Sequence, residues 1–383
     1  MTAPSRYEIC HLFLSPLHNE SRMFKELATA EKLFPAKALL SIGLQRDEKE
    51  RPTTLLGRYP CQRIKLWSAN LPKSLPFQLI KYVEWIFRAA RKARASGASI
   101  IHCHSVPALP AAVLAAAFTD RRIIYDAHEL ESRRAGFSTL RTFLVWALEK
   151  GLLTFCDQIL TVSPSIYDYY KREFPKKDVS LLMNIPRKAS GRQIPLRTKF
   201  GIPRDSRITM YVGGFVKGRG IDLLLKAFSN LGNDHHLIFM GEGHLDAEIE
   251  KAARERPNIH LSKPVDERDV VPTLSQADLS FSVNDCESLN HQFSLPNKFF
   301  QSLMAGVPIL VNTQNVDMLL VGKESELVYS VDYDAEEVRK FITVFSGEKI
   351  DRIPISFSWE SQEEVLLSAY RRLISMRKKK AAD

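Results

Sequence analysis

A cluster of polar and cationic side chains lies between Glu287 and Pro308, in the segment ESLNHQFSLPNKFFQSLMAGVP. Pro296 near a first helical turn and Gly306 just past a last turn predict a short helix over Asn297 to Ala305. A helix N-terminus presents unpaired backbone N–H groups and a partial positive charge, which suit a phosphate group. Lys298, in the first turn, adds a full charge. The segment could therefore bind a phosphorylated ligand, or it could be an ordinary connection in an α/β domain.

A glycine-rich loop upstream has compatible chemistry. The predicted strand Ile208 to Val212 is followed by GGFVKGRG (Gly213 to Gly220) and a predicted helix over Ile221 to Leu231. Glycines let a backbone approach a ligand closely, and Lys217 and Arg219 supply positive charge. The loop lacks the G-K-[ST] ending of a Walker loop, which excludes that class of nucleotide site.

Two predicted strands in the first half of the chain end in polar side chains. SIIHCHS (Ser99 to Ser105) carries His102 and His104, and RIIYDAHE (Arg122 to Glu129) ends in Asp126, His128 and Glu129. Polar ends on neighbouring strands fit a binding crevice. The histidines also invite a metal interpretation, but they are not in an H-E-x-x-H helix and no third ligand is spaced to close a site. We therefore predict no metal ligand.

The elements that must position these groups alternate between strand and helix. A strand over Tyr7 to Ser15, a helix over Met23 to Leu33 and a strand over Ala36 to Ile42 begin a doubly wound sheet. Ligands of such sheets bind beyond the carboxyl ends of the strands, where the loop from His18 to Arg22 lies. The segment Ile185 to Arg207, rich in proline and cations, predicts a linker, after which the strand-and-helix pattern restarts.

Together these motifs resemble those of GT-B glycosyltransferases, most closely the family-4 type with S-x-P-N-K before the helix and A-G-x-P after it. The similar segments are Ser294–Lys298, Ala305–Pro308, Tyr211–Gly220 (Y-x-G-x-x-x-x-[KR]-G), Gly241–His244 and Tyr125–Glu129. The resemblance covers nearly the whole chain. It is strongest over residues 211–308 and weakest over residues 44–74.

The resemblance implies an α/β chain of GT-B type, with two Rossmann-like domains facing a central cleft. We expect an acceptor-binding domain over residues 1–186, a nucleotide-sugar-binding domain over 187–358, and a C-terminal helix over 359–383 returning to the first domain. The implied enzyme is a metal-independent hexosyltransferase that moves sugar from a nucleotide diphosphate sugar to a glycan or lipid-linked acceptor, with retention. It implies no cofactor, and a setting in bacterial surface polysaccharide or glycolipid synthesis, such as lipopolysaccharide or capsule.

The resemblance also implies residue roles. Catalytic roles fall to His128, Glu287, Arg219 and Lys298. Donor contacts fall to Gly213, Gly214, Arg219, Gly241, Glu242, Asn290, His291, Ser294, Leu295, Asn297, Lys298 and Gln301. The acceptor side is assigned to His18, Asn19, Arg22, His104 and Glu129. For the loop containing Asn19 and Arg22, a helix cap and a surface arginine remain the alternative.

The sequence departs from the family pattern at three positions. Gly214 stands where many members have arginine, so phosphate charge must fall on Arg219 and Lys298. The family's E-x7-E glutamates align with Phe293 and Gln301, of which Gln301 can still hydrogen-bond a ribose. These losses keep open a catalytically silent scaffold that binds a nucleotide sugar or a partner transferase. A nucleotide-sugar epimerase can share the architecture as well.

The sequence Asp332-Tyr333-Asp334 spells the D-x-D that metal-dependent glycosyltransferases of another fold use to hold Mn²⁺. Asp334, however, directly precedes Ala335-Glu336-Glu337-Val338, which predicts a helix start. An aspartate at that position caps the helix, and acidic residues suit its first turn. We therefore assign Asp334 a structural role.

Composition bounds the compartment and the partners. The 383 residues carry a net charge of +10, and the five cysteines are scattered without a C-x-x-C pair, which favours a reducing compartment. The N-terminus lacks the apolar core of a signal peptide, and the longest apolar run, Ala108 to Phe118, is too short to span a bilayer. We predict a cytoplasmic protein. No zinc finger, aromatic RNP pattern or long basic arm indicates nucleic acid as a partner.

The predicted helix Leu75 to Gly97 is amphipathic and basic at its end. Leu79, Val83, Ile86 and Ala90 share one face, and Arg88, Arg91, Lys92 and Arg94 gather near the C-terminus. We favour packing of the apolar face on the sheet. The basic end could bind an anionic membrane surface, which would place the protein peripherally on the inner face of the cytoplasmic membrane.

Overall fold

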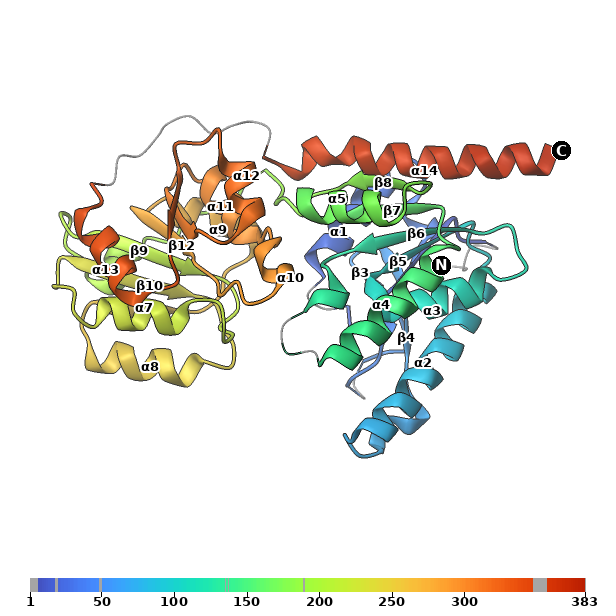
Figure 1. Cartoon of the computed structure of the whole chain (residues 1–383), viewed down its shortest axis with the longest axis horizontal. Helices are drawn as coiled ribbons and strands as arrows, with labels where there is room; N and C mark the ends of the chain where they lie inside the picture. The colour runs from blue at the N-terminus through green and yellow to red at the C-terminus, as the bar shows by residue number, and fades with distance from the viewer. Residues whose placement is uncertain are drawn as a thin grey trace. The chain divides into compact units, whose positions relative to one another are not determined.

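The structure, a computed structural model, describes residues 6–17, 20–47, 50–134, 136, 138–188, 190–346 and 357–382. The chain forms two compact units. Unit 1 comprises Met1–Met183 with Gln362–Asp383, and unit 2 comprises Asn184–Ser361. Each unit has its own sheet covered by helices (Figure 1).

Unit 1 is built on a sheet whose eight described strands are parallel except for the antiparallel β3–β4 pair. Its strands are β1 (Ile9–Leu12), β2 (Leu39–Leu44), β3 (Thr53–Leu56), β4 (Tyr59–Ile64), β5 (Ile100–His104), β6 (Arg122–Ala127), β7 (Gln158–Thr161) and β8 (Asp178–Leu181). Its helices are α1 (Ser21–Ala30), η1 (Ala36–Ala38), η2 (Trp67–Asn70), α2 (Leu75–Ala95), α3 (Ser105–Ala116), η3 (Glu131–Arg133), α4 (Thr139–Leu153), α5 (Pro164–Glu173) and α14 (Trp359–Ala382). The central strands are buried along their whole length, as expected of a parallel sheet with helices on both faces.

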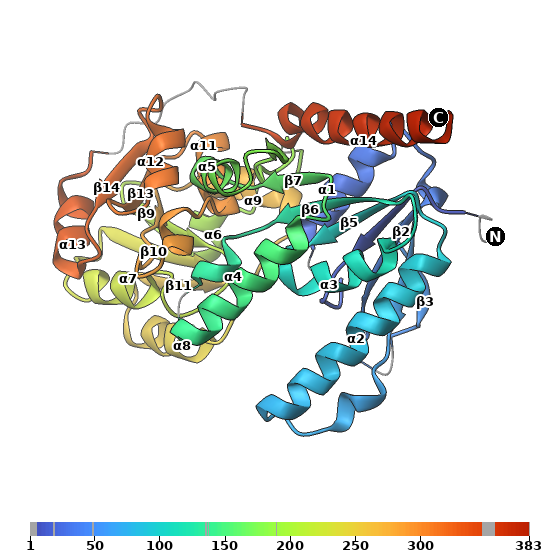
Figure 2. The ribbon, with the colours of Figure 1, turned by 45° about the vertical axis from the view of Figure 1, so that its right-hand side comes forward.

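The strand order in unit 1 is β3-β4-β2-β1-β5-β6-β7-β8. The chain therefore moves outward from β1 in one direction and, after α2, resumes at β5 on the other side of β1. Such a reversal is the point where doubly wound sheets form ligand crevices. In Figure 2, α1 and α14 lie on one face of this sheet and α2 and α3 on the other.

Unit 2 repeats the plan with six described strands, all parallel, in the order β11-β10-β9-β12-β13-β14. The strands are β9 (Arg207–Val212), β10 (His235–Met240), β11 (Ile259–Ser262), β12 (Leu279–Ser282), β13 (Ile309–Asn312) and β14 (Val328–Val331). The helices are α6 (Leu196–Phe200), α7 (Ile221–Phe228), α8 (Asp246–Glu255), α9 (Glu267–Leu274), α10 (Leu289–Gln292), α11 (Asn297–Met304), α12 (Val316–Gly322) and α13 (Ala335–Val344). Its reversal lies between β9 and β12.

These two sheets confirm the predicted fold class of two Rossmann-like α/β domains. The predicted helix after Pro296 is also confirmed, as α11. Asp334 caps α13 as predicted, because its carboxylate accepts hydrogen bonds from the backbone N–H groups of Glu336 and Glu337 at 2.9 and 3.0 Å.

The predicted orientation of α2 is wrong in its N-terminal half. Leu79 and Val83, expected to pack on the sheet, are 60% and 42% exposed. The buried side chains of this helix are instead Trp85, Ala89, Ala90 and Ala93. Figures 1 and 2 show the cause, because the N-terminal end of α2 extends beyond the sheet.

One buried carboxyl group in unit 1 gives a testable effect on stability. Glu149 of α4 is only 2% exposed and accepts hydrogen bonds from the hydroxyls of Tyr170 and Tyr125, the latter at 2.8 Å. Burial raises the pKa of Glu149 to about 7, although the two hydrogen bonds oppose the shift. The folded protein therefore binds this proton more tightly than the unfolded chain does.

We predict that Glu149 makes unit 1 less stable as the pH rises. Its contribution is complete below the unfolded-state pKa of about 4.3 and is lost as the pH rises to about 7. Glu149→Gln keeps an acceptor for both tyrosines and should be more stable than the parent at pH 8, by up to about 3 kcal/mol. The measurement is the unfolding temperature of both proteins from pH 4.5 to 8, with the surface variant Glu173→Gln as control. A difference that stays constant with pH would contradict the prediction.

Candidate active site

Lys298, in the first turn of α11, is a buried cation without a counter-charge. The residue is 5% exposed, and its Nζ has no hydrogen-bond partner among the residues that the structure describes. Its Nζ lies 4.0 Å from the centroid of the Tyr211 ring, a cation–π contact. Burial, and then the positive charge of Arg219, lower the pKa of Lys298 well below its usual value.

The start of α11 offers further unused hydrogen-bonding groups. The buried Oδ1 of Asn297, next to Lys298, also has no partner among the described residues. The first N–H groups of an α-helix have no partner within the helix and present a partial positive charge. An unpaired ammonium and a helix N-terminus at one place suit an anion, because both are destabilising until a negative group neutralises them.

The glycine-rich loop after β9 lies beside this helix start. The hydroxyl of Tyr211 donates to the carbonyl of Gly214 at 3.0 Å, and the N–H of Phe215 donates to the carbonyl of Glu242 at 2.9 Å. Gly220 has φ of +77°, and a Cβ there would stand 2.2 Å from the carbonyl oxygen of Val283. No other residue type fits that position, so the loop geometry is fixed by its sequence.

The loop after β12 is held by a dense set of hydrogen bonds. His291 Nδ1 lies 2.5 Å from Asp285 Oδ1, and the N–H of Asp285 donates to the carbonyl of Gly218 at 2.8 Å. The amide of Asn315 donates to the carbonyls of His291 and Ser294 at 3.0 and 3.2 Å. The two loops that flank the reversal of the sheet are therefore tied to each other.

The structure gathers all the predicted donor residues at the carboxyl edge of the sheet in unit 2. Gly213, Gly214 and Arg219 follow β9; Gly241 and Glu242 follow β10; Glu287, Asn290, His291, Ser294 and Leu295 lie between β12 and α11; Asn297, Lys298 and Gln301 are on α11. Arg219 and Glu287 are exposed, whereas Gln301 is 7% exposed. Whether these residues bind a donor stays a prediction.

Sequence reasoning missed two residues of this group, Tyr211 and Asp285. Tyr211 supports Lys298 from the end of β9, and Asp285 fixes His291. Asp285 could have been found, because polar residues just beyond a buried parallel strand point to the ligand edge. Tyr211 begins the segment that resembles the family's Y-x-G-x-x-x-x-[KR]-G, but nothing in the sequence marked it as a neighbour of Lys298.

In unit 1, Asp126 at the end of β6 organises the predicted catalytic histidine. Arg22 donates to both Asp126 oxygens, at 2.8 Å from Nε and 2.7 Å from Nη2. Nε2 of His128 lies 3.0 Å from Asp126 Oδ2, and Nδ1 of His104 lies 3.2 Å from the same oxygen. Although burial would raise the pKa of Asp126, Arg22 and the histidines hold it well below its usual range. The predicted convergence of the two polar strand ends is thus confirmed.

The residues assigned to the acceptor side lie in different environments. Arg22 is 3% exposed and also donates to the carbonyl of Leu182 at 3.0 Å, so the surface-arginine alternative is wrong. His104 is likewise buried, and Glu129 pairs with Arg134 at 3.4 Å. His18 and Asn19 lie outside the described residues. Arg22 and His104 position Asp126 and His128 in this structure, and an acceptor contact stays a prediction.

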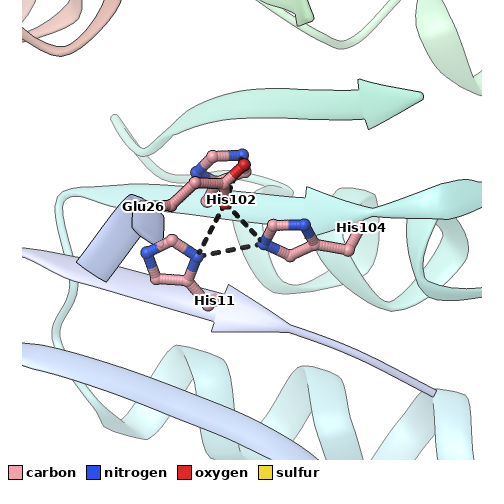
Figure 3. Close-up of side chains that lie close together, drawn as sticks. All are labelled: His11, Glu26, His102 and His104. Carbon is pink, nitrogen blue, oxygen red and sulfur yellow. Dashed lines mark hydrogen bonds and ion pairs between the residues drawn. The ribbon is translucent and has the colours of Figure 1, made fainter. Parts of the chain in front are cut away.

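Within the part of the chain that the structure describes, two groups of side chains have ligand atoms close enough to hold a metal ion. One comprises His104, Asp126 and His128, and the other His11, Glu26, His102 and His104 (Figure 3). The first group is accounted for by its own hydrogen bonds, at 3.0 to 3.2 Å. The Asp332–Asp334 pair contributes to neither, since Asp332 accepts a hydrogen bond from Thr313 and Asp334 caps α13.

Two family models match the sequence, one over part of each unit. Glycosyltransferase Family 4 matches residues 50–184, and Glycosyl transferases group 1 matches residues 193–330. No curated protein matches it.

Solved structures similar to the chain share its fold at low sequence identity. Sucrose-phosphate synthase from Thermosynechococcus elongatus has a TM-score of 0.76 at 15% identity, covering 97% of this chain and 100% of its own. Anabaena Alr3699/HepE in complex with UDP and glucose has a TM-score of 0.65 at 12% sequence identity, and the match covers 98% of this chain and 99% of that one. The lipopolysaccharide outer core galactosyltransferase WaaB has a TM-score of 0.61 at 11% sequence identity, and the match covers 94% of this chain and 99% of that one.

The isolated charge of Lys298 gives a prediction that needs no ligand. Because the pKa of Lys298 is lowered on folding, the unfolded chain binds its proton more tightly and the free protein is destabilised at neutral pH. Lys298→Met keeps the length of the side chain and should raise the free energy of unfolding at pH 7.5, by about 0.5–2 kcal/mol.

The gain should shrink as the pH approaches the unfolded-state lysine pKa of about 10.4, where the parent loses the same charge in both states. Urea unfolding at pH 7.5 and 10 measures this gain, and Lys217→Met, at an exposed position of the glycine-rich loop, is the control. A less stable Lys298→Met at pH 7.5 would show that the ammonium is paired.

Proposed function

The chain belongs to the GT-B glycosyltransferases of the family-4 type, and from this premise we propose that it transfers a sugar from a nucleotide diphosphate sugar to an acceptor hydroxyl. Similar solved structures include one in complex with UDP and glucose, which supports a nucleotide sugar as donor. The family resemblance supports retention of the anomeric configuration. The acceptor we propose is a glycan or lipid-linked glycan of the bacterial surface, which the similarity to a lipopolysaccharide galactosyltransferase supports.

The observation that carries the proposal is the unpaired, buried ammonium of Lys298 at the N-terminus of α11. Breaking a glycosidic bond to a diphosphate leaves negative charge on the departing oxygens. Preorganised cations and N–H dipoles stabilise such charge without reorganising when it develops. Lys298, Arg219 and the first turn of α11 would supply them, so the leaving group needs no divalent cation and no cofactor.

The family resemblance supports the remaining assignments. His128 would lie beside the donor sugar, with its ring held by Asp126 at 3.0 Å. Glu287 would approach the same sugar from its exposed loop, and Gln301 would hydrogen-bond the ribose in place of a glutamate. Gly214 stands where many family members have arginine. The glycine is not required by lack of space, because a Cβ at this position would meet only Val216 at 3.8 Å and Glu242 at 4.0 Å.

We also propose that unit 1 binds an anionic membrane surface through α2. Leu75, Leu79 and Phe87 are 84%, 60% and 61% exposed along this helix. Near its end, Arg91 and Arg94 line a groove of about 430 Å³ together with Phe87 and Leu114. Apolar side chains beside cations suit the boundary between headgroups and acyl chains. Among the described residues, no helix is both long enough and apolar enough to cross a bilayer.

The leaving-group assignment predicts how turnover responds to mutation and chelation. Arg219→Ala and Lys298→Ala should each lower turnover on the order of 10²–10³-fold, the scale of losing one preorganised donor. Lys226→Ala, at an exposed position on α7, should leave turnover unchanged. Turnover should also survive brief treatment with EDTA. The assay measures nucleoside diphosphate release from a panel of nucleotide sugars in the presence of lipid-linked acceptors.

Other outcomes would replace the proposal. Activity lost in EDTA and restored by Mn²⁺, with both cation variants active, would place the leaving group elsewhere. Nucleotide binding without turnover on any acceptor would favour the silent scaffold. Epimerised nucleotide sugar formed without acceptor would favour the epimerase.

The membrane surface predicts salt-sensitive binding to vesicles of phosphatidylglycerol. Replacing both Arg91 and Arg94 by glutamine should weaken binding by about 2 kcal/mol, or roughly 30-fold, because each cation contributes about 1 kcal/mol near such a surface. Arg88 stays in both proteins, because it pairs with Glu84 at 2.9 Å. Co-sedimentation at low salt measures the effect, with Lys251→Gln/Arg254→Gln on α8 as control. If the parent protein does not co-sediment with anionic vesicles at low salt, the membrane assignment is wrong.

A further inference from the structure

Four buried side chains in unit 1 converge on one point, and only one of them, His104, has a predicted role in the proposed transfer. They are His11 of β1, Glu26 of α1, and His102 and His104 of β5, which we call the three-histidine cluster (Figure 3). His11, Glu26 and His102 have no exposed surface, and His104 is 3% exposed. Sequence spacing offered only the two histidines of β5, and the fold adds the third histidine and the carboxylate.

The topology of the sheet explains the convergence. His11 and His102 are direct neighbours in the parallel β1–β5 pair, so their side chains leave the sheet on the same face. His104 follows His102 by two residues and therefore shares that face. Glu26 reaches the face from α1, one helical turn after Arg22. All four lie at the reversal of strand order between β1 and β5.

The distances between the inward-facing atoms match a tetrahedral metal site. His11 Nδ1 and His104 Nε2 are 3.0 Å apart, and Glu26 Oε2 lies 3.9, 3.9 and 3.7 Å from the nearest nitrogens of His11, His102 and His104. Zn–N bonds of about 2.1 Å in a tetrahedron require ligand atoms about 3.4 Å apart. The observed separations lie on either side of that value.

Hydrogen bonding within the cluster does not satisfy these atoms. His102 Nε2 and both oxygens of Glu26 have no hydrogen-bond partner among the described residues, although Glu26 Oε1 forms an ion pair with Arg22 at 3.0 Å. A metal-free stack of neutral histidines would account for the 3.0 Å contact of His11 and His104 but would leave His102 Nε2 and Glu26 Oε2 unpaired. Buried polar atoms without partners are destabilising, and an ion would satisfy these two.

We propose that His11, Glu26, His102 and His104 bind one divalent transition-metal ion of the zinc type as a structural site. Three imidazole nitrogens and a carboxylate oxygen suit zinc, and four protein ligands close a tetrahedron with no position left for substrate. Burial lowers the pKa of His11 and of His102, which keeps both imidazoles in the neutral form that binds metals. Burial and Asp126 raise the pKa of Glu26, so the ion displaces its proton.

Neighbouring residues already orient two of the ligands as metal sites require. His102 Nδ1 lies 2.8 Å from the hydroxyl of Tyr370 on α14, and His104 Nδ1 lies 3.2 Å from Asp126 Oδ2. Such partners fix which ring nitrogen carries the proton and which faces the metal. The ion would join β1, β5 and α1 directly, and α14 through Tyr370.

The inference does not depend on the proposed sugar transfer. The leaving group is proposed to meet cations of unit 2, whereas this site would hold β1, β5 and α1 of unit 1 together. The two share one link, because His104 lies 3.2 Å from Asp126, which holds His128. Because its ligands are buried, brief treatment of the folded protein with EDTA would leave the ion in place. The chelation test of the leaving group therefore does not interfere with this one.

The test is the metal content of the full chain produced in minimal medium with Co²⁺ or Zn²⁺ and then dialysed against EDTA. We expect one ion per chain, and a visible absorption spectrum of tetrahedral Co²⁺ in the cobalt protein. Glu26→Gln and His102→Gln should lose both signals. Tyr370→Phe, which removes only the bond to His102, should weaken metal affinity about 10–100-fold.

The control is His260→Gln in unit 2. His260 Nε2 lies 2.9 Å from His236 Nδ1, but among the described residues these two histidines belong to no group of three possible metal ligands. This variant should keep the full metal content. A folded parent protein that carries no ion after growth in either metal would overturn the proposal, as would full metal content in Glu26→Gln and His102→Gln. If those variants fail to fold, the parent's metal content and cobalt spectrum still decide.

Discussion

The buried carboxylate of Asp126 is the charge on which unit 1 depends. A carboxylate removed from water is tolerated only when it is paired and hydrogen-bonded, and removing one partner of such a pair costs about 3–5 kcal/mol. Arg22 meets this need with two short bonds, and its third nitrogen donates to the carbonyl of Leu182. One guanidinium thus links α1, β6 and the segment after β8. The position of His128 follows from this pairing, because its ring is held by the same carboxylate.

In the described part of unit 2 the central buried charge, Lys298, lacks the kind of ion pair that Asp126 has in unit 1. Lys298 is also buried, yet its Nζ has no partner among the described residues, and its support is the face of Tyr211. Rigid surroundings make this arrangement possible. Asn315, which has no exposed surface, bonds to the loop before α11, and the loop containing Arg219 is fixed where Gly220 packs on Val283. In the proposed site, an anion that binds Lys298 would recover the stability lost there in the free protein, and preorganisation of this kind increases affinity.

How much the sequence could predict differed between local and long-range features. Caps and turns are local, so α11 after Pro296 and the Asp334 cap were predicted from a few residues. The fold class followed from the alternation of strands and helices. The exposed face of α2 could not be predicted, because periodicity shows that a helix has an apolar face but not whether the sheet extends far enough to cover it. The three-histidine cluster was also beyond reach, since His11 and His102 are 91 residues apart and meet only through strand register.

The departures from the family pattern partly compensate one another in charge around the proposed diphosphate position. Glycine at position 214 removes one positive charge relative to members with arginine there. Phe293 and Gln301, in place of two glutamates, remove two negative charges, so the local balance becomes more positive by one. In the proposed transfer, Lys298 and Arg219 would act on the leaving group with fewer competing carboxylates. The missing glutamates therefore do not by themselves imply a silent protein. Under this proposal the positive charge needed at bond cleavage is retained, and the loss would fall on recognition of the ribose, to which Gln301 would offer hydrogen bonds without a charge.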